Sequence, residues 1–153
     1  MNMLYGDARA LHLLHVHNAL TRTELQRHRG REVKHTGDGI MASFASAPDA
    51  VQCAIAIQKA FTAYNQENSE APLYLRIGLS AGEPIEEHGD LFGKAVQLAA
   101  RLCAEAEPGS ILVAQLVADQ CQGKALPFSP SRELTPKGFD DAIAVSDVNW
   151  MEA

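Results

Sequence analysis

Residues 32–44 read EVKHTGDGIMASF, and this stretch decides the fold that the sequence predicts. A strand-like segment at 31–36 runs into Thr-Gly-Asp-Gly, and a more apolar segment follows at 39–45. Two short strands around a turn of glycine and aspartate are typical of a β-hairpin. Asp38 lies at the tip of this hairpin, where it is either a turn residue or a carboxylate that holds a ligand.

The rest of the chain alternates helical and strand-like patterns. Helices are expected at 7–28, where Asp7 caps the start, and at 46–65, 93–105 and 114–122. Further strands are expected at 73–82, 110–114, 130–135 and 142–149, and 85–88 is expected to extend the sheet. This order favours one α+β domain over residues 1–153, with the helices packed on one face of the sheet.

The composition is that of a globular domain, because 46% of the 153 residues are hydrophobic and 21% are charged. A net charge of −6 argues against a nucleic-acid partner. We expect no membrane insertion and a cytoplasmic location, since the sequence has neither a long apolar run nor a signal-peptide pattern. Cys53, Cys103 and Cys121 are far apart, which favours reduced core residues over disulfides or a zinc site.

A second acidic segment gives Asp38 a context. Asp90 is followed by Gln97 and Arg101, which lie one helical turn apart and share a helix face. Lys34 lies four residues before Asp38 on the strand that leads into the turn. Taken singly, each of these residues is also compatible with an ordinary turn, cap or surface position.

Taken together, these segments resemble the class III adenylate/guanylate cyclase catalytic domain. The resemblance is carried by four stretches, residues 32–44, 76–82 (RIGLSAG), 89–102 (GDLFGKAVQLAARL) and 107–113 (EPGSILV). It covers nearly the whole chain and implies an antiparallel-rich, ferredoxin-like α+β fold. It also implies a lyase that forms cyclic AMP and pyrophosphate from ATP, by attack of the ribose 3′-hydroxyl on the α-phosphate.

The resemblance also assigns roles to residues. Asp38 matches a ligand of the family's two divalent metal ions, Mg²⁺ or Mn²⁺, which take carboxylate oxygens. Lys34 and Asp90 match the pair that reads the purine. A lysine donor beside an aspartate acceptor suits adenine, because adenine offers an acceptor at N1 and a donor at its 6-amino group. The pair therefore implies ATP rather than GTP.

Three more residues match positions around the phosphates and ribose. Arg101 matches the arginine that stabilises charge on the α-phosphate in the transition state. Gln97 stands where the family has an asparagine that orients the ribose, so its amide is one methylene further out. Lys137, in Leu-Thr-Pro-Lys-Gly, resembles a lysine that contacts the triphosphate.

The start of the chain departs from the family. Family domains begin with a strand Phe-x-Asp-Ile-x-Gly-Phe-Thr, whose aspartate is the first metal ligand, and residues 1–7 (MNMLYGD) do not match it. We read Asp7 as a helix start and not as a substitute. The first strand is therefore expected to be absent, through truncation or through evolutionary loss of turnover, and cyclase activity is expected to be weak or absent.

Three functions remain open at this stage. The chain is an adenylate cyclase, which by resemblance works as a head-to-tail homodimer, or a catalytically inactive cyclase-like module that binds nucleotide or regulates a partner. The third possibility is a structural or interaction domain with no nucleotide role. The missing strand and Gln97 favour the second over a normal enzyme, and the joint match at Lys34, Asp38, Asp90 and Arg101 argues against the third.

Overall fold

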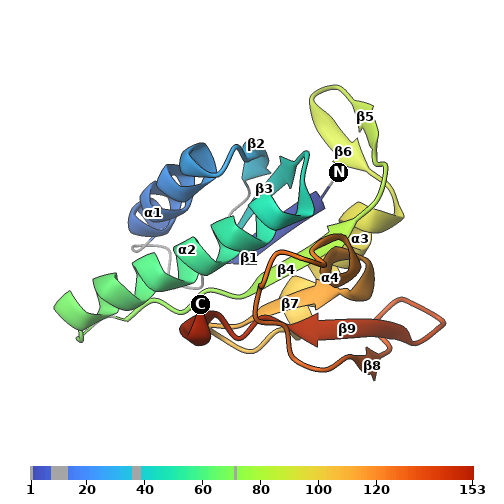
Figure 1. Cartoon of the computed structure of the whole chain (residues 1–153). Helices are drawn as coiled ribbons and strands as arrows, with labels where there is room; N and C mark the ends of the chain where they lie inside the picture. Colours follow the sequence, from blue (N-terminus) through green and yellow to red (C-terminus); the bar gives the residue numbers. More distant parts are fainter. Residues whose placement is uncertain (1, 8–13, 36–38, 71) are drawn as a thin grey trace.

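The computed structural model describes residues 2–7, 14–35, 39–70 and 72–153, and side chains from residue 16 onward. Its main feature is a seven-stranded sheet in the order β2-β3-β1-β4-β7-β9-β8 (Figure 1). The strands are β1 (Asn2–Asp7), β2 (Arg31–His35), β3 (Gly39–Phe44), β4 (Ile77–Ala81), β7 (Ile111–Ala114), β8 (Arg132–Leu134) and β9 (Ile143–Asp147). Four α-helices are described, α1 (Leu14–Arg27), α2 (Ala47–Glu67), α3 (Lys94–Glu105) and α4 (Gln115–Gln120), and a 3₁₀ helix, η2 (Trp150–Glu152), ends the chain.

The sheet is rich in antiparallel pairs, which confirms the α+β class. Strands β2 and β3 form the predicted antiparallel hairpin, and β8 pairs antiparallel with β9 as expected for the last two strands. Only the β4–β7 pair in this described sheet is parallel. Because α3 connects β4 to β7 in the sequence, the parallel pair is joined by a helical crossover.

The expectation that the sheet lacks its central first strand is wrong. Strand β1 lies between β3 and β4 and pairs antiparallel with both, from Asn2 opposite Phe44 to Asp7 opposite Gly39. Without it, the facing edges of two buried strands would expose unpaired backbone groups, which is costly. Residues 2–7 therefore form a strand although they do not carry the family motif, and Asp7 ends that strand instead of starting a helix.

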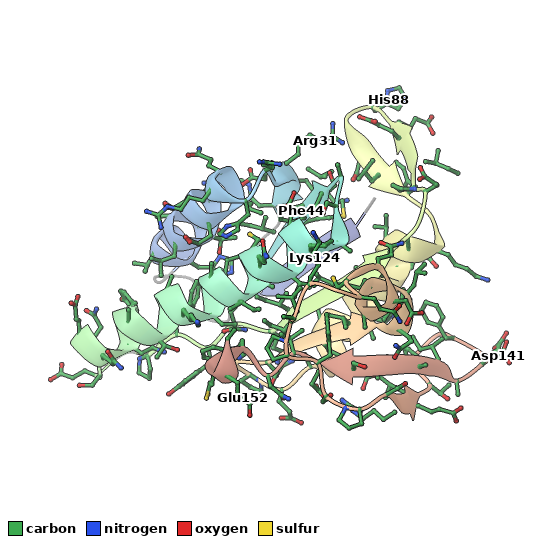
Figure 2. All side chains as sticks on the ribbon, in the orientation of Figure 1. Arg31, Phe44, His88, Lys124, Asp141 and Glu152 are labelled. Carbon is green, nitrogen blue, oxygen red and sulfur yellow. The ribbon has the colours of Figure 1, made fainter. Side chains whose placement is uncertain are left out.

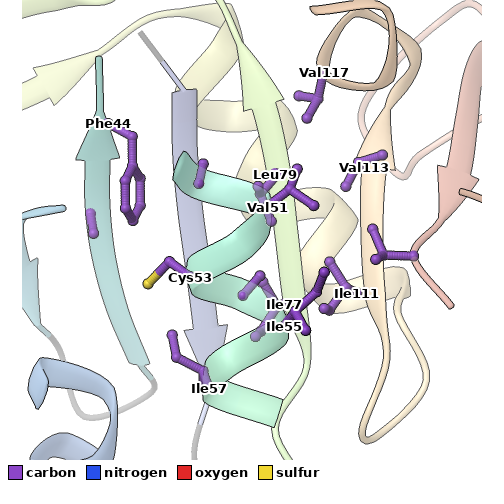
Figure 3. Packing of buried hydrophobic residues seen from close by; sticks show 14 of the residues in the cluster. Phe44, Val51, Cys53, Ile55, Ile57, Ile77, Leu79, Ile111, Val113 and Val117 are labelled. Carbon is purple, nitrogen blue, oxygen red and sulfur yellow. The ribbon is translucent and has the colours of Figure 1, made fainter. Parts of the chain in front are cut away.

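Helices cover both faces of the sheet, which corrects the expectation of a single covered face. Alternate residues of β7 pack against helices on opposite faces of the sheet. Ile111 and Val113 belong to the main core with α2 and α4 (Figure 3), whereas Leu112 and Ala114 pack with Leu102 of α3. A strand buried on both faces reads as a continuous apolar run, as this one does.

Helix α3 approaches the sheet closely at Gly78 of β4. A methyl group added there would lie 2.3 Å from the backbone nitrogen of Cys103 and 2.5 Å from the backbone oxygen of Ala99. Only glycine leaves room for this contact, so the position of α3 depends on residue 78. Gln97 and Arg101, two predicted site residues, are carried by this helix.

Two segments that were predicted to belong to the main sheet lie outside it. The segment 73–76 is not in the sheet, because side-chain amides bind its backbone: Asn65 bonds both the N–H and the carbonyl of Leu73, and Gln58 donates to the carbonyl of Leu75. Residues 85–88 do not extend the main sheet either. They contribute β5 (Ile85–Glu87), which pairs with β6 (Asp90–Phe92) in a separate projecting hairpin (Figure 1).

Two smaller expectations can be compared with the structure. Cys53, Cys103 and Cys121 are all buried, in agreement with their predicted core role. None of the helices in the described ranges combines the length and apolar character needed to cross a bilayer.

Candidate functional site

An ion pair joins the edge strand β2 to the β5–β6 hairpin. The Nζ atom of Lys34 lies 2.7 Å from Oδ2 of Asp90, while the backbone N–H of Leu91 donates to Oδ1 of the same carboxylate at 2.8 Å. The hydrogen bond from Lys34, followed by that from Leu91, lowers the pKa of Asp90. The carboxylate is therefore kept ionised and can only accept hydrogen bonds.

The Lys34–Asp90 pair remains accessible to a ligand. The two side chains are 46% and 26% exposed, so neither is sealed beneath the hairpin. A planar ligand edge with an acceptor next to a donor would find a matching donor and acceptor here. The fold thus brings together two predicted site residues that lie 56 positions apart in the sequence.

A second ion pair joins the same elements. The guanidinium of Arg31 on β2 lies 3.3 Å from a carboxylate oxygen of Glu86 on β5. Figure 2 shows Arg31 on the side of β2 that faces the hairpin, with His88 at the hairpin tip. The hairpin is therefore held to β2 at two points, and Asp90 lies at one of them.

Helix α3 supplies the next two residues. Gln97 and Arg101 are exposed, whereas Ala99, Leu102 and Cys103 on the other side of the helix are buried against the sheet. The spacing of four residues places Gln97 and Arg101 one turn apart on one face, as the sequence predicted. The rigid contact at Gly78 fixes the height of this face above the sheet.

A cleft of about 580 Å³ lies between the start of α3 and the segment that leads into β9. Gln97 forms part of one wall, and Gly138, the neighbour of Lys137 in the predicted turn, forms part of the other. Figure 2 shows Asp141 at the end of this turn. The structure thus brings Gln97 close to the turn that carries Lys137, but Lys34 and Asp90 are not among the residues that line the cleft.

The charges that line this cleft are mixed. Lys94 is the basic residue of the lining, and Glu83, Asp140 and Asp141 are acidic. A polyphosphate entering such a cleft gains little from its walls without cations that offset the carboxylates. Lys94 was not predicted as a site residue, although its place three residues before Gln97 at the start of the helix is a signal that could have suggested it.

The predicted metal ligand Asp38 lies outside the described residues. Its neighbour Gly39 begins β3 and is the register partner of Asp7 at the end of β1. Asp7 therefore ends its strand beside the start of β3, and carboxylate oxygens are the donors that Mg²⁺ and Mn²⁺ prefer. No group of three or more metal-binding side chains occurs within the described part of the chain.

Comparisons with known proteins identify the family of the domain. The model of the adenylate and guanylate cyclase catalytic domain matches residues 6–144. "Putative adenylate cyclase 3" of Rhizobium meliloti (strain 1021) is 40% identical over 98 residues, which is 63% of this chain and 17% of that protein. An uncharacterized protein of Mycobacterium tuberculosis (strain ATCC 25618 / H37Rv) is 36% identical over 121 residues, or 78% of this chain and 30% of that protein. The chain therefore corresponds to a minor part of these relatives' length.

Solved structures give the same result for the fold. The adenylate/guanylate cyclase/hydrolase from Silicibacter pomeroyi superposes with a TM-score of 0.84 at 30% identity, covering 96% of this chain and 94% of the other. The adenylyl cyclase CyaB from P. aeruginosa shares the fold with a TM-score of 0.80 at 20% identity, covering 96% and 92%. The chain belongs to the adenylate and guanylate cyclase catalytic domain family.

Proposed function

We propose that this domain binds ATP in preference to GTP and converts it to cyclic AMP and pyrophosphate, with slow turnover in the chain as it stands. The observation that carries the proposal is the 2.7 Å contact between Lys34 and Asp90. Adenine presents an acceptor at N1 and a donor at its 6-amino group, to which Lys34 can donate and from which Asp90 can accept. Guanine presents the opposite polarity at these positions, so both contacts would be lost.

The ionised state of Asp90 strengthens this preference. Because its pKa is lowered, the carboxylate offers no proton to the O6 acceptor of guanine near neutral pH. Lys34 likewise has only donors, which would face the N1–H donor of guanine. The pair therefore favours adenine over guanine, because Lys34 and Asp90 are each mismatched with the guanine group that they would face.

The remaining roles in the reaction fall to residues on α3 and in the turn before β9. Arg101 is exposed on α3 and suits the stabilisation of charge on the α-phosphate, since a guanidinium stays charged and makes forked contacts to phosphate. Gln97 would orient the ribose through its amide, and Lys137 would contact the triphosphate. The shared cleft of Gln97 and the Lys137 turn supports placing ribose and phosphates in one region.

We assign metal binding to Asp38, and we propose Asp7 as the residue that supplies the second carboxylate. The support is the register between Asp7 and Gly39, which places Asp7 next to the residue that follows Asp38. Two divalent cations would supply activation of the 3′-hydroxyl and neutralisation of the triphosphate. Asp7 lies in a strand that differs from the family motif, so we expect turnover to be slow.

We also propose that two copies associate head to tail, so that purine-reading residues of one copy face metal-binding residues of the other. Ile85 and Phe92 are register partners on the β5–β6 hairpin and are 64% and 49% exposed, which leaves an apolar surface beside Asp90. Sedimentation that shows only monomers at high protein concentration with ATP and Mn²⁺ would contradict this. The cytoplasmic location and the single-domain extent of 1–153 remain predictions from the sequence.

The first experiment is a calorimetric titration with ATP and with GTP in the presence of Mn²⁺. We expect ATP to bind more tightly, and we expect Lys34→Ala to abolish the difference. Lys124→Ala is the control, because Lys124 is also exposed but lies on the loop after α4 and not on β2 or the β5–β6 hairpin. Equal binding of the two nucleotides by the wild type would refute the proposed base selection.

The second experiment follows cyclic AMP formation from ATP with Mn²⁺. We expect Asp38→Asn to abolish the slow turnover, and we expect Asp7→Asn to do the same if Asp7 supplies the second carboxylate. A catalytically inactive module that binds nucleotide is the alternative, favoured by the absent family motif and by Gln97. ATP binding without turnover in the wild type would select this alternative.

A further inference from the structure

The register of β2 is irregular next to the residue that is proposed to read the base. Glu32 is opposite Ala42, and Lys34 is opposite Met41. Two steps along β2 therefore correspond to only one step along β3. Val33 is therefore the additional residue of a β-bulge. Because Met41 and Ala42 are consecutive, they point to opposite faces of the sheet, and so do Glu32 and Lys34.

Side-chain contacts give independent evidence that Glu32 and Lys34 point to opposite faces of the sheet. On the face covered by α1, Arg22 forms a forked bond with Glu32, at 2.7 Å from Nε and 3.2 Å from Nη2. The same Nη2 lies 3.4 Å from Nδ1 of His35. Glu32 and His35 are three residues apart and would point to opposite faces in a regular strand, so a single arginine can contact both only because of the bulge.

The other face receives the two residues between them. Val33 packs with Met41 and Leu91 in a small cluster, and Lys34 bonds to Asp90, the residue before Leu91. A regular register through this segment would turn Lys34 toward α1 and would place His35 on the face of Asp90. The face of the sheet to which the Lys34 side chain points thus depends on which of two registers β2 adopts.

We propose that Arg22 is a positioning residue for base selection, which holds the bulge of β2 in place by binding Glu32 and His35 and thereby aims Lys34 at Asp90. The proposal rests on the proposed function only in its reference to base selection. Strand β2 needs a contact that fixes its register, because it is an edge strand of five residues whose only partner in the described sheet is β3. Weakly specified edge strands are prone to register slippage.

The test is Arg22→Met, with two measurements. The first is the pKa of the Asp90 carboxyl, followed by ¹³C NMR without nucleotide. We expect this pKa to rise toward the ordinary value as the contact with Lys34 is lost for part of the time. The second is the ratio of ATP to GTP affinity from the titration above, which we expect to fall about threefold, as suits the loss of a partly exposed ion pair.

The matched control is Arg132→Met. Arg132 is half exposed and pairs with Asp147 at 3.3 Å on the opposite edge of the sheet. The substitution therefore removes a similar ion pair far from Lys34. We expect it to change neither measurement. A charge exchange, Arg22→Glu with Glu32→Arg, should restore both values in part, which a general loss of stability would not allow.

A second pair of variants tests the bulge without Arg22. Val33→Lys with Lys34→Val keeps a lysine on the face of Asp90, whereas Lys34→Val with His35→Lys moves it to the face of α1. We expect the first to keep a lowered Asp90 pKa and the second to lose it, and the reverse order would overturn the inference. An Asp90 pKa unchanged by Arg22→Met would also overturn it. A wild type that binds neither nucleotide would refute the proposed function, while the nucleotide-free titration still decides how Lys34 is aimed.

Discussion

The contact between Gly78 and α3 makes a sharp prediction for Gly78→Ala. The added methyl carbon would lie 2.3 Å from the backbone nitrogen of Cys103, whereas ordinary contacts begin at 3.4 Å. Relief therefore requires α3 and β4 to separate by about 1 Å, because both sides of the contact are backbone. Overpacking of a core costs about 1–3 kcal/mol, and the absence of a flexible neighbour places this case near about 3 kcal/mol.

Urea unfolding is the appropriate assay. With a slope of about 2 kcal/mol per molar urea, the midpoint should fall by about 1.5 M. The control is Gly30→Ala, where the added carbon meets the ring of Phe44 and the end of Leu25, which are side chains that can move, so the midpoint should fall less. An equal or smaller effect at Gly78 would refute the assignment of a rigid backbone contact. A variant that still folds should also lose turnover, because displacing Gln97 and Arg101 by about 1 Å costs about a hundredfold in rate.

Three other predictions follow from the site and the core. Glu32 has a pKa lowered mainly by its hydrogen bond from Arg22, so this pair stabilises the fold above the ordinary carboxyl pKa of about 4.3 and the effect is lost as pH falls through the lowered value. The difference in Tm between wild type and Arg22→Met should therefore be present at neutral pH and vanish in acid, and a difference that persists in acid would contradict the ion pair. Burial raises the pKa of Cys53 to about 12 and of Cys121 to about 11, so both thiols should react with Ellman's reagent only after denaturation, and rapid native labelling would disprove their burial. Gln97→Asn should raise kcat by shortening the amide to the family length, and a fall in kcat would show that Gln97 is adapted to this site.

The sequence predicted those parts of the fold that depend on local pattern. The β2–β3 hairpin follows from the glycines around Asp38, and α3 follows from the helical pattern of residues 93–105, in which Gln97 and Arg101 lie one turn apart. A single segment reveals each of these two features. The pairing of Lys34 with Asp90 was reached only through the family resemblance, because no local rule connects residues 56 positions apart.

The remaining features depend on tertiary partners. Strand β1 was missed because residues 2–7 are short and lack the family motif, and its strand conformation is supported by pairing with both β3 and β4. The bulge at Val33 was missed because Glu-Val-Lys-His reads as an ordinary strand, and the contacts that favour the bulge come from Arg22 on α1 and Leu91 on β6. Segment 73–76 was assigned to a strand because its apolar alternation does not show that Asn65 and Gln58 bind its backbone.

The same bulge has a consequence for the solubility of the domain. Strand β2 forms one open edge of the sheet, where unpaired backbone groups invite a strand from another molecule. Charged side chains project from both faces of this edge, Glu32 toward α1 and Lys34 toward β6, and the irregular register interrupts the even ladder that an incoming strand would need. The strand proposed to select the nucleotide is therefore also built to resist the edge-to-edge pairing that leads to aggregation.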